Sequence, residues 1–240
     1  MITLTVELQG CLGDHLFQIT MAYSFAKAHG CELVFSKNDP IWFDYFRDLD
    51  VLPWKCISDS EYVSIDWTRI HYATLDHTIQ TPKLAGFYMI YGHIQSNRVS
   101  YIDEIRPILQ IHEYHRTKAK ANLAQLSIHD PDGWIVGHAL KGDAKYFKEA
   151  RATIGKRIGP RTVCWITDDV EWIYRNLYEQ GDTVNAISDV MIDFASIALF
   201  RHIIVSNIYS WWAAWLNPSN YSDRIIYYEP ECMCIETTSG

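Results

Sequence analysis

Residues 203–217, near the end of the chain, place a strand, a polar turn and a helix start side by side. The run 203–205 is β-branched and is typical of a buried strand. Ser206, Asn207 and Ser210 follow, and these residue types favour turns and helix N-caps. The tryptophan-rich remainder predicts one or two helical turns, which an Asn-Pro pair ends.

A helix that begins directly after such a turn has two possible roles. Its first N–H groups and the positive end of its dipole form a site that fits a diphosphate. The simpler alternative is a buried strand followed by an aromatic core helix. Both interpretations remain open from the residues alone.

The N-terminal region predicts the start of a doubly wound parallel sheet. A β-branched strand at 2–8 precedes a turn that contains Gly10 and Gly13, and a helix at 16–29 leads to a second strand at 31–35. The two glycines either let a ligand approach the backbone or only allow the turn.

The remaining pattern again alternates strands and helices, so the predicted fold class is α/β with parallel sheets. Strands are expected at 86–91, 134–138, 162–167, 184–187 and 224–228, and helices at 98–108, 115–126, 144–154, 170–180 and 193–200. A short helix and loop is expected at 40–53, and a basic turn at 155–161. The turn-rich segment 127–133 is the expected linker between two halves, 1–126 and 134–228, and residues 229–240 form a tail.

Composition excludes several classes of protein. The 240 residues are 48% hydrophobic, enough for one large domain or two compact halves. The net charge of −8 and the lack of a basic face argue against nucleic acid as a partner. No segment predicts a signal peptide or a membrane span, and the six cysteines show no C-x-x-C spacing. We therefore expect a soluble, cytoplasmic protein without a metal site, whose oligomeric state the sequence leaves open.

Four loops are expected at the carboxyl ends of strands, at 10–15, 138–143, 167–169 and 206–210. Such ends meet at one edge of a parallel sheet, so these loops predict one shared site.

Three of these loops supply groups that could bind or activate a substrate. His138, Lys141 and the backbone of Gly142 would neutralise a diphosphate leaving group, and Ser206, Asn207 and Ser210 would donate to its oxygens. Asp168 or Asp169 would accept from a purine N–H edge or a ribose hydroxyl. Asp143 is a candidate general base if a neighbour or burial raises its pKa. The alternatives are an N-cap at Asp169, a core histidine at His138 and a solvated charge at Lys141.

Five motifs together resemble the α-1,2-fucosyltransferases of glycosyltransferase family 11. The family's patterns are G-x-L-G-N-Q-x-F-Q, G-Y-F-Q-S, H-x-R-R-G-D, S-D-D-x-x-W and N-S-x-F-S-W-W-x-A-W-L. The corresponding segments here are 10–18, 92–96, 138–143, 167–172 and 206–216. Their order and spacing hold over nearly the whole chain.

The resemblance implies a GT-B-like fold of two Rossmann-like halves, with the acceptor on the first and the nucleotide-sugar on the second. It implies GDP-fucose as donor, inversion at the anomeric carbon, a glycan acceptor, and neither a metal nor a cofactor. His138, Lys141 and Asp143 would be catalytic, and His93, Gln95 and Ser96 would contact the acceptor. The implied donor-binding residues are Gly10, Gly13, Asp14, His15, Gly142, Asp168, Asp169, Ser206, Asn207, Tyr209 and Ser210.

The chain departs from the family pattern where the donor's phosphates are expected. Leu140 replaces the first arginine of H-x-R-R-G-D and Lys141 the second, and leucine donates no hydrogen bond. Another cation (Lys145, Arg98 or Arg157) replaces the arginine, or the donor differs, or catalysis is weak. The leading hypothesis is a fucosyltransferase. The alternatives are a catalytically impaired nucleotide- or glycan-binding protein and an unrelated Rossmann-like nucleotide enzyme.

Overall fold

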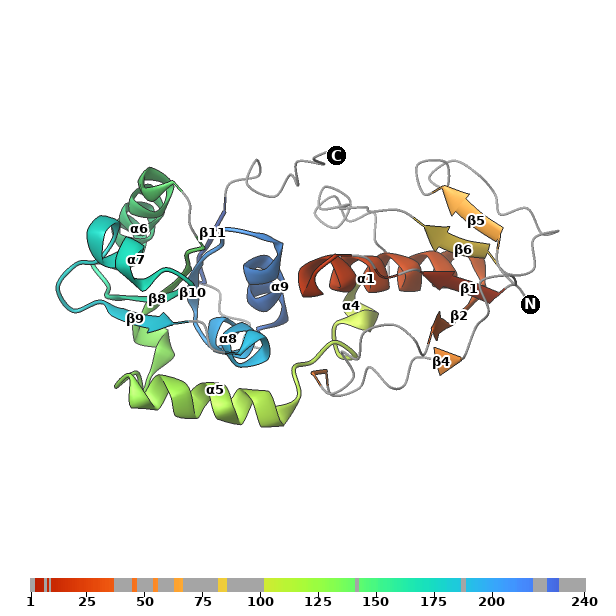
Figure 1. Ribbon diagram of the computed structural model, residues 1–240, viewed down its shortest axis with the longest axis horizontal. Helices are drawn as coiled ribbons and strands as arrows, with labels where there is room; N and C mark the ends of the chain where they lie inside the picture. The colour runs from red at the N-terminus through yellow and green to blue at the C-terminus, as the bar shows by residue number, and fades with distance from the viewer. Residues whose placement is uncertain are drawn as a thin grey trace. The chain divides into compact units, whose positions relative to one another are not determined.

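The computed structural model describes residues 3–6, 8, 10–36, 45–46, 54–55, 63–66, 82–85, 102–140, 143–186, 189–217 and 224–228. The chain divides into two compact units, 1–110 and 111–240. Figure 1 colours the chain by residue number, from red at the N-terminus to blue at the C-terminus. The expected strand at 86–91 and most of the expected helix and loop at 40–53 lie outside the described residues. Within the described ranges, no helix is long and apolar enough to cross a membrane.

The first unit contains a parallel sheet of four strands in the order β2-β1-β6-β5. Its described elements are β1 (Thr3–Val6), α1 (Leu12–His29), β2 (Glu32–Leu33), β3 (Phe35–Ser36), β4 (Trp54–Lys55), β5 (Val63–Asp66), β6 (Pro82–Ala85) and α4 (Ile102–Ile105). Strands β3 and β4 pair separately, also in parallel. The strand–helix–strand unit predicted at the N-terminus is therefore confirmed.

Helix α1 begins four residues earlier than the predicted residue 16, which corrects the expected loop at 10–15. The Asp14 carboxylate accepts a hydrogen bond from the backbone N–H of Cys11 at 2.8 Å and so caps the helix. Gly13, Asp14 and His15 consequently lie in the first turn of α1 rather than in a loop. The helix ends as predicted at Gly30, which has φ 65°.

The second unit contains a parallel sheet of five strands in the order β11-β10-β7-β8-β9. Its described elements are α5 (Glu113–Gln125), the 3-10 helix η3 (Pro131–Gly133), β7 (Ile135–His138), α6 (Ala144–Ile158), β8 (Val163–Thr167), α7 (Val170–Asn176), β9 (Thr183–Ala186), α8 (Val190–Ile197), β10 (His202–Ile204), α9 (Ile208–Leu216) and β11 (Ile226–Tyr227). Figure 1 shows α6 and α7 on one side of this sheet and α8 and α9 on the other. The predicted class, α/β with parallel sheets, is confirmed.

Two boundaries in this unit differ from expectation. The predicted basic turn at 155–161 is largely helix, because α6 continues through Gly155 to Ile158 and ends at Gly159, which has φ 84°. The expected linker at 127–133 lies inside the second unit, because α5 precedes it and packs against α8. The break between units therefore falls before α5.

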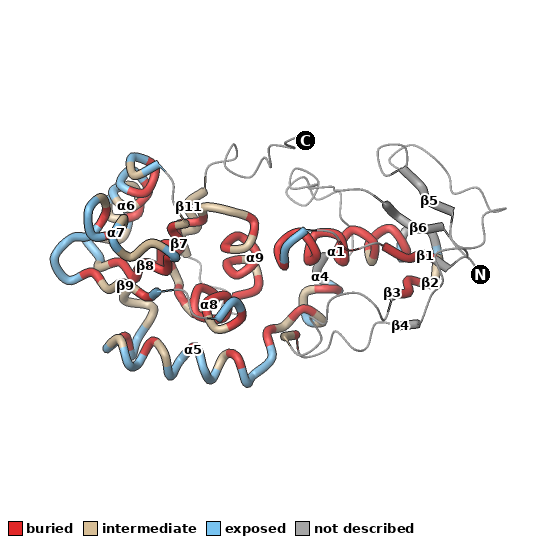
Figure 2. Tube along the Cα trace, viewed as in Figure 1, coloured by how far each residue is buried: buried red, intermediate tan, exposed pale blue. Residues whose placement is uncertain are grey.

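The core of the second unit lies between strands β7 and β8 and helices α6 and α7. Both strands are buried along their whole length, as expected for parallel strands covered on both faces (Figure 2). Phe147 packs edge-on against Trp165 with ring centroids 5.8 Å apart. Trp165 in turn lies against Gly137, where an added Cβ would come within 2.4 Å of the indole ring. Glycine at this position therefore lets the indole pack on the central strand.

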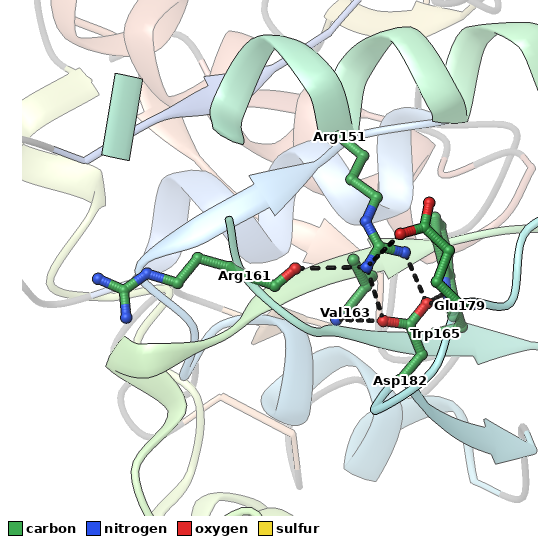
Figure 3. A network of polar contacts seen from close by, with 6 residues as sticks. All are labelled: Arg151, Arg161, Val163, Trp165, Glu179 and Asp182. Carbon is green, nitrogen blue, oxygen red and sulfur yellow. Dashed lines mark hydrogen bonds and ion pairs between the residues drawn. The ribbon is translucent and has the colours of Figure 1, made fainter. Parts of the chain in front are cut away.

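A buried carboxylate joins α6 to the starts of β8 and β9 (Figure 3). Asp182 accepts from Arg151 Nη1 at 2.7 Å and from Nη2 at 3.0 Å. It also accepts from Val163 N–H at 2.9 Å, from Trp165 Nε1 at 3.1 Å and from Glu179 N–H at 3.1 Å. Five donors thus satisfy one carboxylate whose side chain is fully buried.

Candidate functional site

The candidate site lies at the carboxyl edge of the second unit's sheet, where β7, β8 and β10 end. Strand β7 pairs with β8 on one side and with β10 on the other. Strand order reverses at this point, since β8 and β9 extend one half of the sheet and β10 and β11 the other. Ligands of open parallel sheets bind in the crevice at such a switch point.

Hydrogen bonds hold the three strand ends together. Ser206 Oγ, after β10, donates to the carbonyl oxygen of His138 at the end of β7. Thr167 Oγ1, at the end of β8, donates to the carbonyl oxygen of Ala139 at 2.6 Å and accepts from Asp169 N–H at 3.0 Å. The structure therefore brings together the loops predicted after these strands. Thr167 was not among the predicted site residues, although its place at a strand end before two aspartates was a usable signal.

Helix α9 begins at this edge with a reciprocal cap. Ser210 N–H donates to Asn207 Oδ1 at 3.0 Å, and Asn207 N–H donates to Ser210 Oγ at 3.3 Å. Ser206 N–H also donates to Ser210 Oγ, at 3.1 Å. The predicted N-cap is confirmed, and it starts the helix at Ile208 rather than at the expected residue 211. The side-chain oxygens of Ser206, Asn207 and Ser210 all take part in bonds within the protein.

His138 is buried beside this turn, with only 2% of its surface exposed. Burial lowers the pKa of His138 to about 4, against smaller opposing effects of the Asn207 side chain and the Asp168 carboxylate. No residue in the described part of the chain forms a hydrogen bond with its Nδ1 atom. A pKa this low makes the imidazole neutral at pH 7, and the role of His138 at a diphosphate stays a prediction.

The ring of Tyr209, in the first turn of α9, lies next to the imidazole. The centroids of His138 and Tyr209 are 5.2 Å apart and their planes are inclined at 38°. On another side, the ring of Phe194 from α8 meets Tyr209 edge-on at 5.0 Å. The Tyr209 hydroxyl donates to the carbonyl oxygen of Val190 at the start of α8.

The predicted acidic residues of this unit differ in their surroundings. Asp143 is exposed and caps α6 by accepting from Lys145 N–H at 2.8 Å. Asp169 caps α7 by accepting from Trp172 N–H at 2.9 Å, as the simpler interpretation of this residue held. Asp168 is exposed. Burial, one of the two conditions under which Asp143 was expected to act as a base, is therefore not met in the ligand-free protein.

The other predicted residues belong to the first unit or lie outside the described part of the chain. Gly10, Gly13, Asp14 and His15 belong to the first unit, where Asp14 and His15 are buried and burial lowers the pKa of His15. The backbone of Gly10 has φ 94°, a conformation that favours glycine. Lys141, Gly142, His93, Gln95 and Ser96 are not among the described residues.

Comparison with known proteins agrees with the α/β architecture. The model of the family described as Glycosyl transferase family 11 matches residues 57–230. The chain belongs to this family. The match covers the whole candidate site of the second unit.

Individual relatives are distant. The O-antigen biosynthesis glycosyltransferase WbnK of Escherichia coli is 25% identical over 163 residues, which cover 58% of this chain and 53% of WbnK. The chain thus aligns with about half the length of this curated relative. The fucosyltransferase NodZ from Bradyrhizobium has a TM-score of 0.57 at 14% identity, over 90% of this chain and 93% of NodZ. POFUT1 in complex with GDP has a TM-score of 0.57 at 9% identity, over 95% of this chain and 98% of POFUT1. These structures show a shared fold with GT-B fucosyltransferases.

Proposed function

We propose that the protein transfers L-fucose from GDP-fucose to a hydroxyl group of a glycan, with inversion at the anomeric carbon. The acceptor oxygen forms a bond to C1 of fucose while the bond from C1 to the diphosphate oxygen breaks and GDP leaves. The second unit holds the nucleotide-sugar, and the first unit carries the acceptor residues His93, Gln95 and Ser96. The reaction uses neither a metal nor a cofactor.

The observation that carries this proposal is the capped turn that starts α9 at the switch point of the sheet, within the region that the family model matches. The backbone N–H groups in the first turn of a helix have no intrahelical acceptor and favour an anion. Support for the donor comes from relatives, since NodZ structures were obtained with GDP and after soaking with GDP-fucose.

The residues around the turn have different roles in this proposal. Ser206, Asn207 and Ser210 shape the start of α9, because their backbone N–H groups donate to side-chain oxygens within the turn. The positive end of the α9 dipole then favours the diphosphate. His138 is neutral without ligand and takes up a proton as the diphosphate binds, because an adjacent anion favours the charged imidazole. Lys141 adds positive charge, and Asp143 acts as general base once the acceptor desolvates it.

The second candidate function is a nucleotide- or glycan-binding protein that has lost catalysis. Two observations favour it: Leu140 stands where the family pattern has arginine, and the buried His138 carries no charge without ligand. Both weaken stabilisation of the leaving group.

Titration calorimetry with GDP, UDP and ADP in the absence of metal tests the donor assignment. Selective binding of GDP, followed by release of GDP from GDP-fucose in the presence of glycan acceptors, supports the transferase. Binding without turnover supports the impaired binding protein. A preference for UDP or ADP would exclude GDP-fucose as donor.

Substitutions of Asp168 and Asp169, in the loop after β8, test the predicted contact with the purine or ribose. We expect Asp168→Ala to weaken GDP binding, if this carboxylate accepts from the purine or ribose. Asp169→Ser removes the charge of Asp169 but keeps a residue that caps α7, so it separates a ligand contact from loss of the helix cap. Equal GDP affinity in both variants and the wild type would exclude the predicted contact.

A further inference from the structure

The imidazole of His138 is buried beside the first turn of α9. Its backbone is fixed, because its carbonyl oxygen accepts from Ser206 Oγ. A functional histidine is usually oriented by a hydrogen bond at its second ring nitrogen. Here Nδ1 has no such partner among the described residues, and both the Asn207 side chain and Tyr209 contact the ring.

Tyr209 is itself held on two sides. Phe194 meets its ring edge-on at 5.0 Å, and Phe194 is fully buried in α8. The hydroxyl donates to the carbonyl oxygen of Val190, also in α8. Helix α8 therefore fixes the plane of the tyrosine ring that borders the imidazole. Phenylalanine, which the family pattern has at this position, lacks the hydroxyl that makes this link.

We propose that Tyr209 is a positioning residue that holds the imidazole of His138 in the orientation needed to receive the diphosphate. The proposal rests on the proposed function and assigns Tyr209 a different part in it. The sequence predicted direct contact between Tyr209 and the donor, whereas the hydroxyl is engaged with α8 and the ring lies against His138.

Two substitutions separate the ring from the hydroxyl. Tyr209→Leu removes the ring that borders the imidazole, and Tyr209→Phe keeps this ring and removes the bond to Val190. Tyr146→Phe is the matched control. The Tyr146 hydroxyl also donates to a backbone carbonyl, that of Val205, but its ring packs against Phe147 and Tyr227 rather than His138.

The first measurement is the NMR signal of the His138 ring in the ligand-free protein, labelled at its ten histidines and assigned by its loss in His138→Gln. In Tyr209→Leu the signal should move by more than the lost ring current of the tyrosine accounts for, because the imidazole changes its orientation. In Tyr209→Phe it should stay close to its position, and in Tyr146→Phe it should be unchanged. An unchanged His138 signal in Tyr209→Leu would overturn the proposal.

The second measurement separates kcat for GDP release from GDP-fucose from the Kd of GDP. We expect kcat to fall roughly tenfold to a hundredfold in Tyr209→Leu, by less in Tyr209→Phe, and not in Tyr146→Phe. A loss of GDP affinity in Tyr209→Phe with an unchanged His138 signal would instead indicate direct contact between the hydroxyl and the donor. Absence of GDP binding in the wild type would refute the proposed function, while the ligand-free NMR signal would still decide whether Tyr209 orients His138.

Discussion

Asp182→Asn should destabilise the second unit strongly, although the substitution barely changes the volume of the side chain. The carboxylate accepts five hydrogen bonds, two of them from Arg151, whose side chain is 15% exposed. An asparagine keeps one acceptor oxygen and turns an NH2 group toward donors that then lack a partner. The guanidinium of Arg151 would retain the ion pair with Glu179 at 3.1 Å.

The magnitude follows from these contacts. Removing one charged partner of a buried ion pair lowers the free energy of unfolding by roughly 3–5 kcal/mol, because the other charge stays buried. Glu179 offsets less than about 1 kcal/mol of this, because its side chain is 63% exposed and water screens the pair. Stranding Trp165 Nε1 or Val163 N–H adds about 1–3 kcal/mol, although these costs overlap with the first. We therefore expect a loss of about 4 kcal/mol in the free energy of unfolding.

Urea denaturation followed by circular dichroism measures this loss, and thermal denaturation should show a midpoint lower by about 10 °C. Glu179→Gln is the control and should cost less than about 1 kcal/mol. The double variant Arg151→Met with Asp182→Asn should be more stable than Asp182→Asn alone, because it removes the uncompensated buried charge. A loss below about 1 kcal/mol in Asp182→Asn, or an equal loss in Glu179→Gln, would refute this account of the network.

Three further predictions concern the site and its support. His138 binds a proton less readily in the folded protein than in the unfolded chain, so the free energy of unfolding should fall by up to about 3 kcal/mol as the pH drops from 6.5 to about 4. The variant His138→Gln should flatten this part of the pH profile, measured by urea denaturation. Equal pH profiles of the variant and the wild type would contradict the lowered pKa. Gly137→Ala should lower the free energy of unfolding by about 1–3 kcal/mol in the same assay, because the new Cβ would lie 2.4 Å from the Trp165 ring. The control Gly155→Ala, with open space around this position in α6, should be neutral or stabilising. Equal effects of the two substitutions would argue against the clash. Leu140→Arg should raise the rate of GDP release from GDP-fucose at least roughly tenfold if the phosphate side lacks a cation, and an unchanged rate would indicate that another cation already serves there.

The strands of the second unit could be predicted from sequence to within one or two residues. Runs of β-branched residues mark β8 and β10 because strands buried on both faces tolerate few polar side chains. The starts of α6 and α7 were predicted at the observed residues, 144 and 170, but other starts were predicted too late. Helices α1, α8 and α9 all begin three or four residues before the expected 16, 193 and 211.

The capping residues explain this difference. The expected starts fell inside each helix, whereas the helices begin directly after their capping residues. Asp189 accepts from Met191 N–H and Ile192 N–H, and Asn207 accepts from Ser210 N–H. Local polar bonds therefore override the apolar pattern at helix ends.

The site was predictable where it depends on one segment and not where it depends on tertiary neighbours. The N-cap of α9 follows from residue types that stand close together in the chain. The neutral state of His138 does not, because it results from burial by several elements. The contacts of Tyr209 come from α8 and from the end of β7, which no spacing in the sequence relates to α9.

The strand order has a consequence for how the second unit folds. The bond from Thr167 to Ala139 closes a loop of 28 residues, whereas the bond from Ser206 to His138 joins residues 68 positions apart. Closing the longer loop costs more chain entropy, so the pairing of β10 with β7 should form later than the pairing of β8 with β7. Until β10 docks, the central strand β7 presents an open, apolar edge to other chains. Slow refolding and concentration-dependent aggregation of this unit should therefore arise from the pairing that also completes the candidate site.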